Sequence, residues 1–130
     1  MVLQVGGLSE ALAQAGCALA KSGTSTLECA LAGVPAVVFY KTSWPNYWIG
    51  KRVVKVKYLA MPNLLAGEAV FPEFIQAAAT PENVARVALA ILRDETRRAA
   101  IQSRLATVVA GLGDAGASTR AAEAIVRLLY

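Results

Sequence analysis

The feature that most constrains the fold of this chain is a turn of small residues at 22–25, Ser-Gly-Thr-Ser, between two apolar segments. Residues 17–20 before it predict a short buried strand, and residues 27–32 after it favour a helix. Proteins of the α/β class build phosphate sites in this way, because the first N–H groups of the helix have no internal partner and can bind an anion. The sequence therefore predicts an α/β fold with a candidate phosphate site at this turn.

Glu28 follows inside the predicted helix, where a carboxylate can accept hydrogen bonds from paired sugar hydroxyls. A second interpretation stays open, because Ser25 and Glu28 have the spacing of a capping box. In a capping box both side chains bond to backbone N–H groups at the start of a helix. The turn by itself is therefore compatible with a nucleotide site or with a helix cap.

The α/β prediction extends along the chain. Pro35–Tyr40 is a β-rich run without alternation, which is typical of a parallel strand covered on both faces. Thr80, Pro81 and Glu82 predict a helix start through a cap, a first-turn proline and a first-turn acid. We expect helices over 8–15, 26–32, 44–54, 80–93, 95–112 and 118–129, strands over 17–21 and 35–40, an extended piece over 58–61, and a loop over 62–76 with one helical turn at 72–74.

Composition excludes several classes of site. The chain has 130 residues, 56% of them apolar, a net charge of +4 and no histidine, so histidine-based metal sites and general bases are excluded within it. Cys17 and Cys29 stand in apolar contexts and are too few for a zinc site or a disulfide framework. We expect no metal and no organic cofactor. The basic residues are few and form no known nucleic-acid module, so no nucleic-acid partner is expected.

A basic cluster accompanies two aromatic residues in and after the predicted helix over 44–54. Its members are Tyr47, Trp48, Lys51, Arg52, Lys55 and Lys57. Such a cluster favours contact with an anionic membrane surface, with the aromatics at the interface. The alternative is a solvated basic face with both aromatics in the core.

Several short motifs follow one another in an order that matches one family. They are Ser22-Gly23-Thr24 with Leu27-Glu28, Ala32-Gly33-Val34-Pro35, Val37–Lys41, Tyr47-Trp48, Lys51–Val56, Pro62–Gly67 and Pro72–Gln76. Over residues 8–128 their order and spacing resemble the C-terminal region of the lipid-A-disaccharide synthases, which have the two-domain, B-type glycosyltransferase fold. The resemblance implies a partial Rossmann-like parallel sheet followed by a helical C-terminal segment.

The resemblance also implies a reaction. Such enzymes move an acylated glucosamine from its UDP donor onto an acylated glucosamine 1-phosphate, peripherally at the cytoplasmic face of the inner membrane and without a metal. Residues 1–130 are then one incomplete donor-binding domain, with an α/β part over 1–61, a donor-closing loop over 62–79 and C-terminal helices over 80–130. The catalytic carboxylate belongs to an N-terminal domain outside these residues, so the chain alone is not expected to catalyse transfer.

Carried over by position, the family assigns individual roles. The residues expected at the donor are Ser22, Gly23, Thr24 and Ser25 at the diphosphate, Glu28 at the ribose, and Asn63, Glu73 and Gln76 on the closing loop. Backbone donors and the helix dipole would then stabilise the departing UDP. Glu68 departs from the pattern, because the family usually has arginine there. An anion at this position is expected to weaken donor binding if the position touches phosphate.

Two other functions stay open. A UDP-sugar 2-epimerase also combines a Ser/Gly turn with a glutamate ahead of Gly-Val-Pro, so the chain is also compatible with a fragment of such an isomerase. A non-catalytic module of the same fold is the third interpretation. Its exposed sheet edge favours a homodimer or a swapped dimer, because an unpaired edge strand is open to pairing with another chain.

Overall fold

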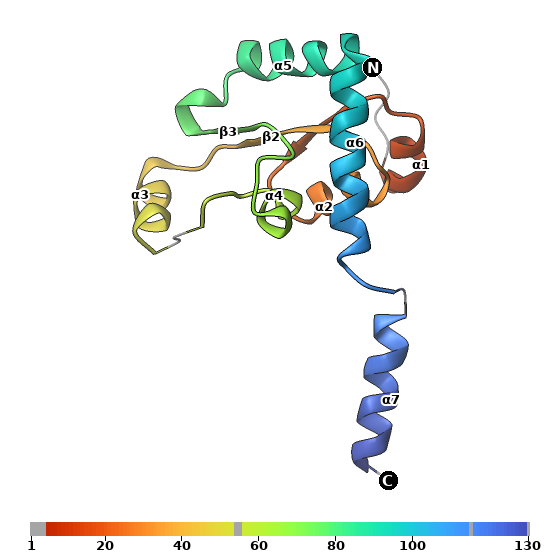
Figure 1. Cartoon of the computed structure of the whole chain (residues 1–130). Coiled ribbons are helices and arrows are strands. Elements are labelled where there is room, and N and C mark those ends of the chain that lie inside the picture. Colours follow the sequence, from red (N-terminus) through yellow and green to blue (C-terminus); the bar gives the residue numbers. More distant parts are fainter. Residues whose placement is uncertain (1–4, 54–55, 115, 130) are drawn as a thin grey trace.

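A computed structural model describes residues 5–53, 56–114 and 116–129, in which a three-stranded parallel sheet lies between helices (Figure 1). The strands are β1 (Ala18–Lys21), β2 (Ala36–Tyr40) and β3 (Glu73–Ile75), in the order β1-β2-β3. The predicted α/β class, with a partial parallel sheet followed by helices, is confirmed.

Strand β2 is the central strand, and both of its faces are covered. Val37 pairs with Leu19 of β1, and Val38 pairs with Glu73 of β3. Ala36 and Val37 have no exposed surface. This burial explains the continuous apolar run of the strand, since a parallel strand covered on both faces needs no polar side.

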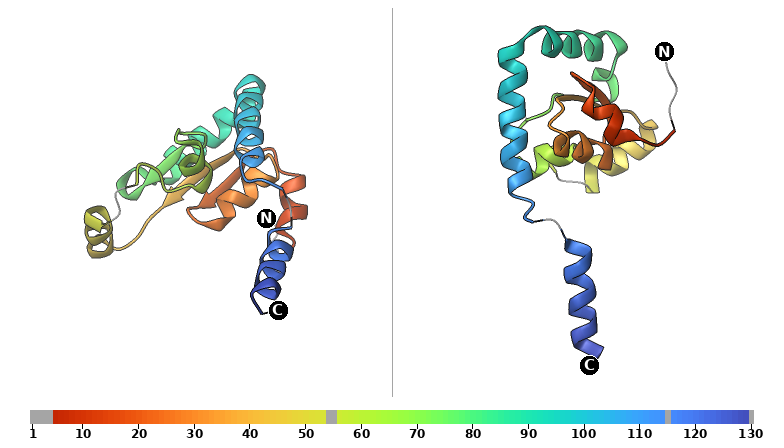
Figure 2. Two further views of the ribbon diagram at one scale, coloured as in Figure 1. Left: turned by 60° about the horizontal axis from the view of Figure 1, so that its bottom comes forward. Right: turned by 90° about the vertical axis from the view of Figure 1, so that its right-hand side faces the viewer.

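The described residues also form helices, of which some cover the sheet and others project from it. They are α1 (Leu8–Ala13), α2 (Thr24–Leu31), α3 (Trp44–Val53), α4 (Met61–Ala66), α5 (Pro81–Arg93), α6 (Glu95–Ala110) and α7 (Ala117–Leu129), with a 3-10 turn, η1, over Gln76–Ala78. Helix α5 packs on one face and α2 on the other, while α6 contacts α5, α2 and α4. Helices α3 and α7 project from this body (Figures 1 and 2).

The core joins the sheet to the C-terminal helices. Phe71 precedes β3, Ile91 lies on α5 and Leu105 lies on α6, and none of the three side chains is exposed. Burial of each such side chain stabilises the fold by about 1.5–3 kcal/mol. All three side chains belong to one buried core, which also includes Ala36, Val37 and Val38 of β2.

The starts of the two long helices are capped by side chains. Thr80 Oγ1 accepts a hydrogen bond from the Asn83 N–H at 3.2 Å, as the predicted helix start requires. Asp94 Oδ1 accepts from the Arg97 N–H at 2.9 Å and caps α6. These caps satisfy backbone donors that have no partner within the helix.

The prediction for residues 58–76 was wrong in two places. The expected loop contains helix α4, which begins at Met61, and strand β3, so the predicted helical turn at 72–74 is extended. Ala60 has the predicted extended conformation. Pro62 lies in the first turn of α4, where proline is favoured. Pro72 disfavours a helical Phe71 before β3, and β3 is completed by hydrogen bonding to β2, which local sequence does not reveal.

Candidate functional site

Four segments meet at the carboxyl ends of the strands. Because the strands are parallel, the residues that follow Lys21, Tyr40 and Ile75 lie along one edge of the sheet. The turn before α4 joins them there, since the Ser22 hydroxyl donates to the Leu59 carbonyl at 2.9 Å. In open α/β sheets the crevice outside this edge is where ligands bind.

Gly23 shapes the turn after β1. Its φ of 144° as the N-cap of α2 lies in a region that favours glycine. A Cβ atom at this position would meet nothing within 4 Å, so the space beside the backbone is open. The Thr26 N–H bonds to the Gly23 carbonyl at 3.1 Å. The amides ahead of it are therefore the ones that this helix N-terminus offers to an anion.

The capping-box interpretation of Ser25 and Glu28 was wrong. Helix α2 begins at Thr24, two residues earlier than predicted, so Gly23 is the N-cap and Ser25 lies inside the helix. The Ser25 hydroxyl donates instead to the Lys21 carbonyl at 3.2 Å.

Thr26 belongs to the site although sequence reasoning did not single it out. Its side chain has no exposed surface. Its hydroxyl donates to the Gly23 carbonyl at 2.7 Å and accepts from the Met61 N–H at 3.2 Å. Thr26 therefore ties the glycine turn to the start of α4. A signal was present in its position three residues before the buried Cys29, which places a polar residue on the inner face of α2.

Glu73 holds the turn before α4. Its carboxylate accepts hydrogen bonds from the Leu59 N–H at 2.9 Å and from the Ala60 N–H at 2.9 Å. The same residue pairs with Val38 in the sheet. A carboxylate engaged by backbone donors in this way links β3 to the segment beside Ser22.

Asn63 is enclosed completely, with no exposed surface. Its Nδ2 donates to the Phe71 carbonyl at 2.8 Å and to Glu73 Oε1 at 2.8 Å, and its Oδ1 accepts from the Phe71 N–H at 2.7 Å. The Asn63 side chain thus holds Phe71, at the end of the loop between α4 and β3, against α4.

Gln76 joins the ends of β2 and β3. The Thr42 N–H donates to Gln76 Oε1 at 2.8 Å, and Gln76 Nε2 donates to the Thr42 carbonyl at 3.0 Å. Its backbone φ of 50° is unusual for a residue other than glycine. The two side-chain bonds hold the linker after β2 in place despite this conformation.

The predicted donor residues are thus brought to one edge of the sheet, with Glu28 on its flank. Four of them form hydrogen bonds from their side chains to backbone groups of neighbouring segments: Ser22, Asn63, Glu73 and Gln76. Their direct contact with a donor stays a prediction.

Glu28 is exposed and lies away from this network. It borders a surface hollow of about 360 Å³ between α1 and α2, together with Ser9, Leu12 and Leu31. Two residues along a helix correspond to a rotation of about 200°, so Glu28 and Thr26 point to roughly opposite sides of α2. The polar network therefore lies at the start of α2, whereas the hollow lies along its second half, where Leu31 and Ala32 also border it.

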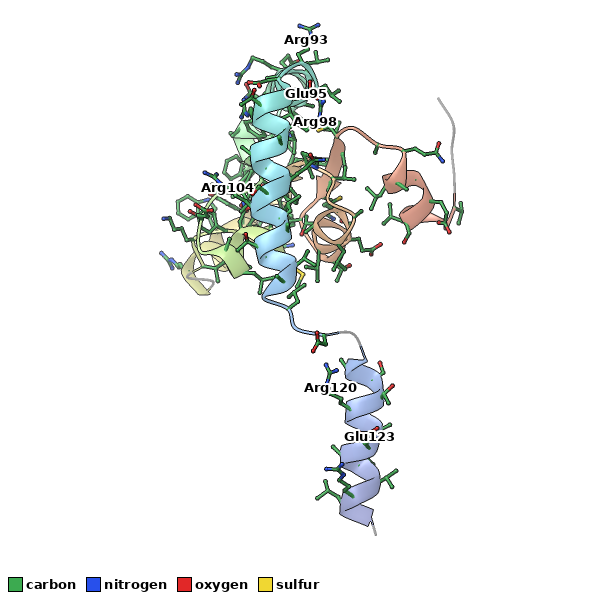
Figure 3. All side chains as sticks on the ribbon, turned by 45° about the vertical axis from the view of Figure 1, so that its right-hand side comes forward. Arg93, Glu95, Arg98, Arg104, Arg120 and Glu123 are labelled. Carbon is green, nitrogen blue, oxygen red and sulfur yellow. The ribbon has the colours of Figure 1, made fainter. Side chains whose placement is uncertain are left out.

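Glu68 lies beyond the other end of α4. Its carboxylate is 3.7 Å from Arg104 Nε on α6, and both side chains are 55% exposed. The two residues border a second hollow, of about 360 Å³, with Leu65 and Val108. Figure 3 shows Arg104 on the middle of α6. Glu68 is therefore paired with a cation, and its expected effect on donor binding stays a prediction.

The basic cluster is only partly described. Trp48 is 59% exposed, which rules out the alternative that places both aromatics in the core, while Tyr47 is half-buried. Arg52 and Lys57 are exposed. Lys51 lies on α3, and Lys55 is outside the described residues.

Two further chemistries find no support at the site. Among the described residues, no cluster of three or more histidine, cysteine or acidic side chains forms a metal site. Burial raises the pKa of the Cys17 and Cys29 thiols. Because the thiolate is the nucleophilic form, neither cysteine is activated for covalent catalysis.

Comparison with known proteins identifies relatives over most of the chain. Residues 3–126 match the sequence model of a family described as Lipid-A-disaccharide synthetase. A lipid-A-disaccharide synthase of Nitrosococcus oceani is 47% identical over 85% of this chain and 28% of its own length. That of Syntrophus aciditrophicus is 44% identical over 95% of this chain and 32% of its own length.

Proposed function

This chain belongs to the lipid-A-disaccharide synthase family, and we propose that it carries the part of such an enzyme that holds the UDP of the sugar donor. The chain spans about a third of the length of the curated relatives it matches. The transfer reaction is accordingly proposed for a longer protein in which these residues form the donor half.

The observation that carries the proposal is the open glycine turn at the start of α2. A diphosphate that approaches Gly23 would meet the first amides of α2, and no atom lies within 4 Å of the position that a Cβ would take there. Backbone N–H groups and the positive end of the helix dipole favour an anion at this place. They would also stabilise the charge that develops on UDP as it leaves, without a metal.

The hollow beside Glu28 suits the nucleoside. It lies on the flank of α2, and its volume of about 360 Å³ is within the range of small-molecule sites. A carboxylate at its rim can accept hydrogen bonds from both ribose hydroxyls. We therefore propose the diphosphate at Gly23, Thr24 and Ser25 and the ribose at Glu28.

Three polar side chains hold the segments around this site: Asn63, Glu73 and Gln76. Glu73 and Asn63 hold the turn that bonds to Ser22, and Gln76 holds the linker after β2. We propose that these three residues fix the segments around the donor. Glu73 is engaged by backbone donors, which agrees with a catalytic carboxylate elsewhere in the longer enzyme.

The reaction and place of action follow from the family. We propose transfer of an acylated glucosamine from UDP onto an acylated glucosamine 1-phosphate, at the cytoplasmic face of the inner membrane. Within the described residues, no helix has the length and apolar character needed to cross a bilayer. The epimerase alternative is not favoured, because both the family match and the relatives are synthases.

A UDP titration tests the proposal. We expect the chain to bind UDP and Glu28→Ala to weaken binding about tenfold, as loss of charge-assisted hydrogen bonds predicts. Glu123→Ala is the matched control, since Glu123 is an exposed glutamate on the projecting helix α7. Calorimetry gives the dissociation constants. Equal affinity of Glu28→Ala and the wild type would contradict the place assigned to the ribose.

A further inference from the structure

The positive charge of the chain is concentrated in one short stretch. Residues 41–57 contain five of the 13 basic residues and none of the nine acidic residues. The other eight basic and nine acidic residues nearly cancel, so this stretch accounts for the net charge of +4. Figure 3 shows the contrasting mixture of signs on α5 and α6, where Arg93, Glu95 and Arg98 lie near one another.

Helix α3, within this stretch, exposes large aromatic rings. Trp44 is 60% exposed and Trp48 is 59% exposed. Residues four apart share a helix face, so Trp44, Trp48 and the exposed Arg52 form a stripe. The Trp44 ring stands edge-on to Tyr47 at 6.0 Å between centroids, which braces it in its outward position.

Two further exposed side chains follow the helix. Val56 is 50% exposed, and Lys57 is exposed with its Nζ 5.3 Å from the centre of the Tyr58 ring. Figures 1 and 2 show α3 at the far end of the molecule from α1 and α6. Exposed apolar side chains and cations therefore lie on a projecting helix and on the segment that follows it.

We propose that α3 is an interfacial anchor that docks the enzyme on an anionic lipid bilayer. Tryptophan favours the boundary between water and lipid because its ring is apolar and its N–H is polar. Cations beside it attract anionic headgroups, each changing the affinity about fivefold. The inference rests on the proposed function in one respect, since acylated substrates require the enzyme to work at such a surface.

Tryptophan fluorescence tests this directly. The chain has two tryptophans, and both lie on α3, so the emission reports on this helix alone. We expect a blue shift when vesicles that contain phosphatidylglycerol are added to the full chain, little shift with phosphatidylcholine vesicles, and reversal by high salt. An unchanged spectrum with phosphatidylglycerol vesicles at low salt would overturn the proposal. An equal shift with single-stranded RNA would also overturn it, because it would indicate a nucleic-acid surface.

Substitutions distinguish α3 from α7, the other projecting helix, as the element that binds the bilayer. Arg52→Gln with Lys57→Gln is expected to weaken vesicle co-sedimentation about thirtyfold, and Trp44→Ser with Trp48→Ser to abolish it. The control pair is Ile125→Ser with Leu128→Ser on α7, whose side chains are 59% and 86% exposed. Loss of binding in the α7 pair but not in the α3 pairs would overturn the assignment.

The same variants distinguish this inference from the proposed function. The α3 substitutions lie outside the assigned UDP contacts, so they are expected to bind UDP like the wild type. If the α3 variants bind both UDP and vesicles like the wild type, the anchor is refuted and the donor site is not. Absent UDP binding in the wild type would instead contradict the donor site and leave the vesicle result to be judged by itself.

Discussion

At the scale of single residues, the site depends on side chains whose partners are backbone groups of distant segments. Asn63 bonds to both backbone groups of Phe71, and Glu73 receives the N–H groups of Leu59 and Ala60. A buried polar group left without its partner is costly, more so than the bond itself is favourable. These residues therefore determine where the turn beside Ser22 stands.

Replacement of Asn63 tests this role. Asn63→Ala leaves the buried Phe71 N–H and carbonyl without partners, so we expect the free energy of unfolding to fall by about 3 kcal/mol. Urea denaturation measures this change. Asn46→Ala, an exposed asparagine on α3, serves as the control and is expected to change it by less than about 0.5 kcal/mol. Equal effects of the two substitutions would show that Asn63 does not brace the loop.

The sequence predicted where the turn at 22–25 lies in the fold better than it predicted the interactions of each candidate side chain. The turn at 22–25 lies at the carboxyl edge of the sheet, with Gly23 in the conformation that explains its presence. Thr26 and the backbone partners of Asn63 and Gln76 were not predicted. Their interactions join residues far apart in sequence, and only the folded chain brings them together.

At the scale of elements, strong local signals predicted the long helices and the first two strands. Helix α5 begins at the Thr80 cap and β2 occupies the β-rich run, as expected. Helix α4 and strand β3, with six and three residues, were missed because residues 62–76 contain two prolines and no clear period. Elements this short are fixed by tertiary contacts, in β3 by its pairing with β2.

The junction of β2 and β3 gives a prediction at this scale. Gln76→Ala removes both bonds to Thr42 while the backbone must still adopt positive φ, so we expect a loss of about 1–3 kcal/mol in unfolding free energy. Gln102→Ala is the matched control, since Gln102 makes one exposed bond to the Gly33 carbonyl. Thermal and urea unfolding measure both variants. A change no larger than that of the control would mean that the junction does not depend on Gln76.

At the scale of the whole molecule, the order of weak motifs identified the family although no single motif was specific. The comparisons confirmed that resemblance over residues 3–126. The outer edge of β1 has no strand beside it among the described residues, so the predicted homodimer or swapped dimer stays a prediction. Sequence patterns could not show how the segments at the carboxyl edge interlock around the glycine turn, because that arrangement exists only in three dimensions.

The central claim is that UDP binds at the start of α2, and amide chemical shifts of the labelled chain test it most directly. During a UDP titration we expect the largest shifts at Gly23, Thr24 and Ser25, followed by residues around Glu28, with α7 unaffected. Largest shifts beside Leu65 and Val108 in the hollow between α4 and α6, or no shifts in a folded chain saturated with UDP, would contradict the account.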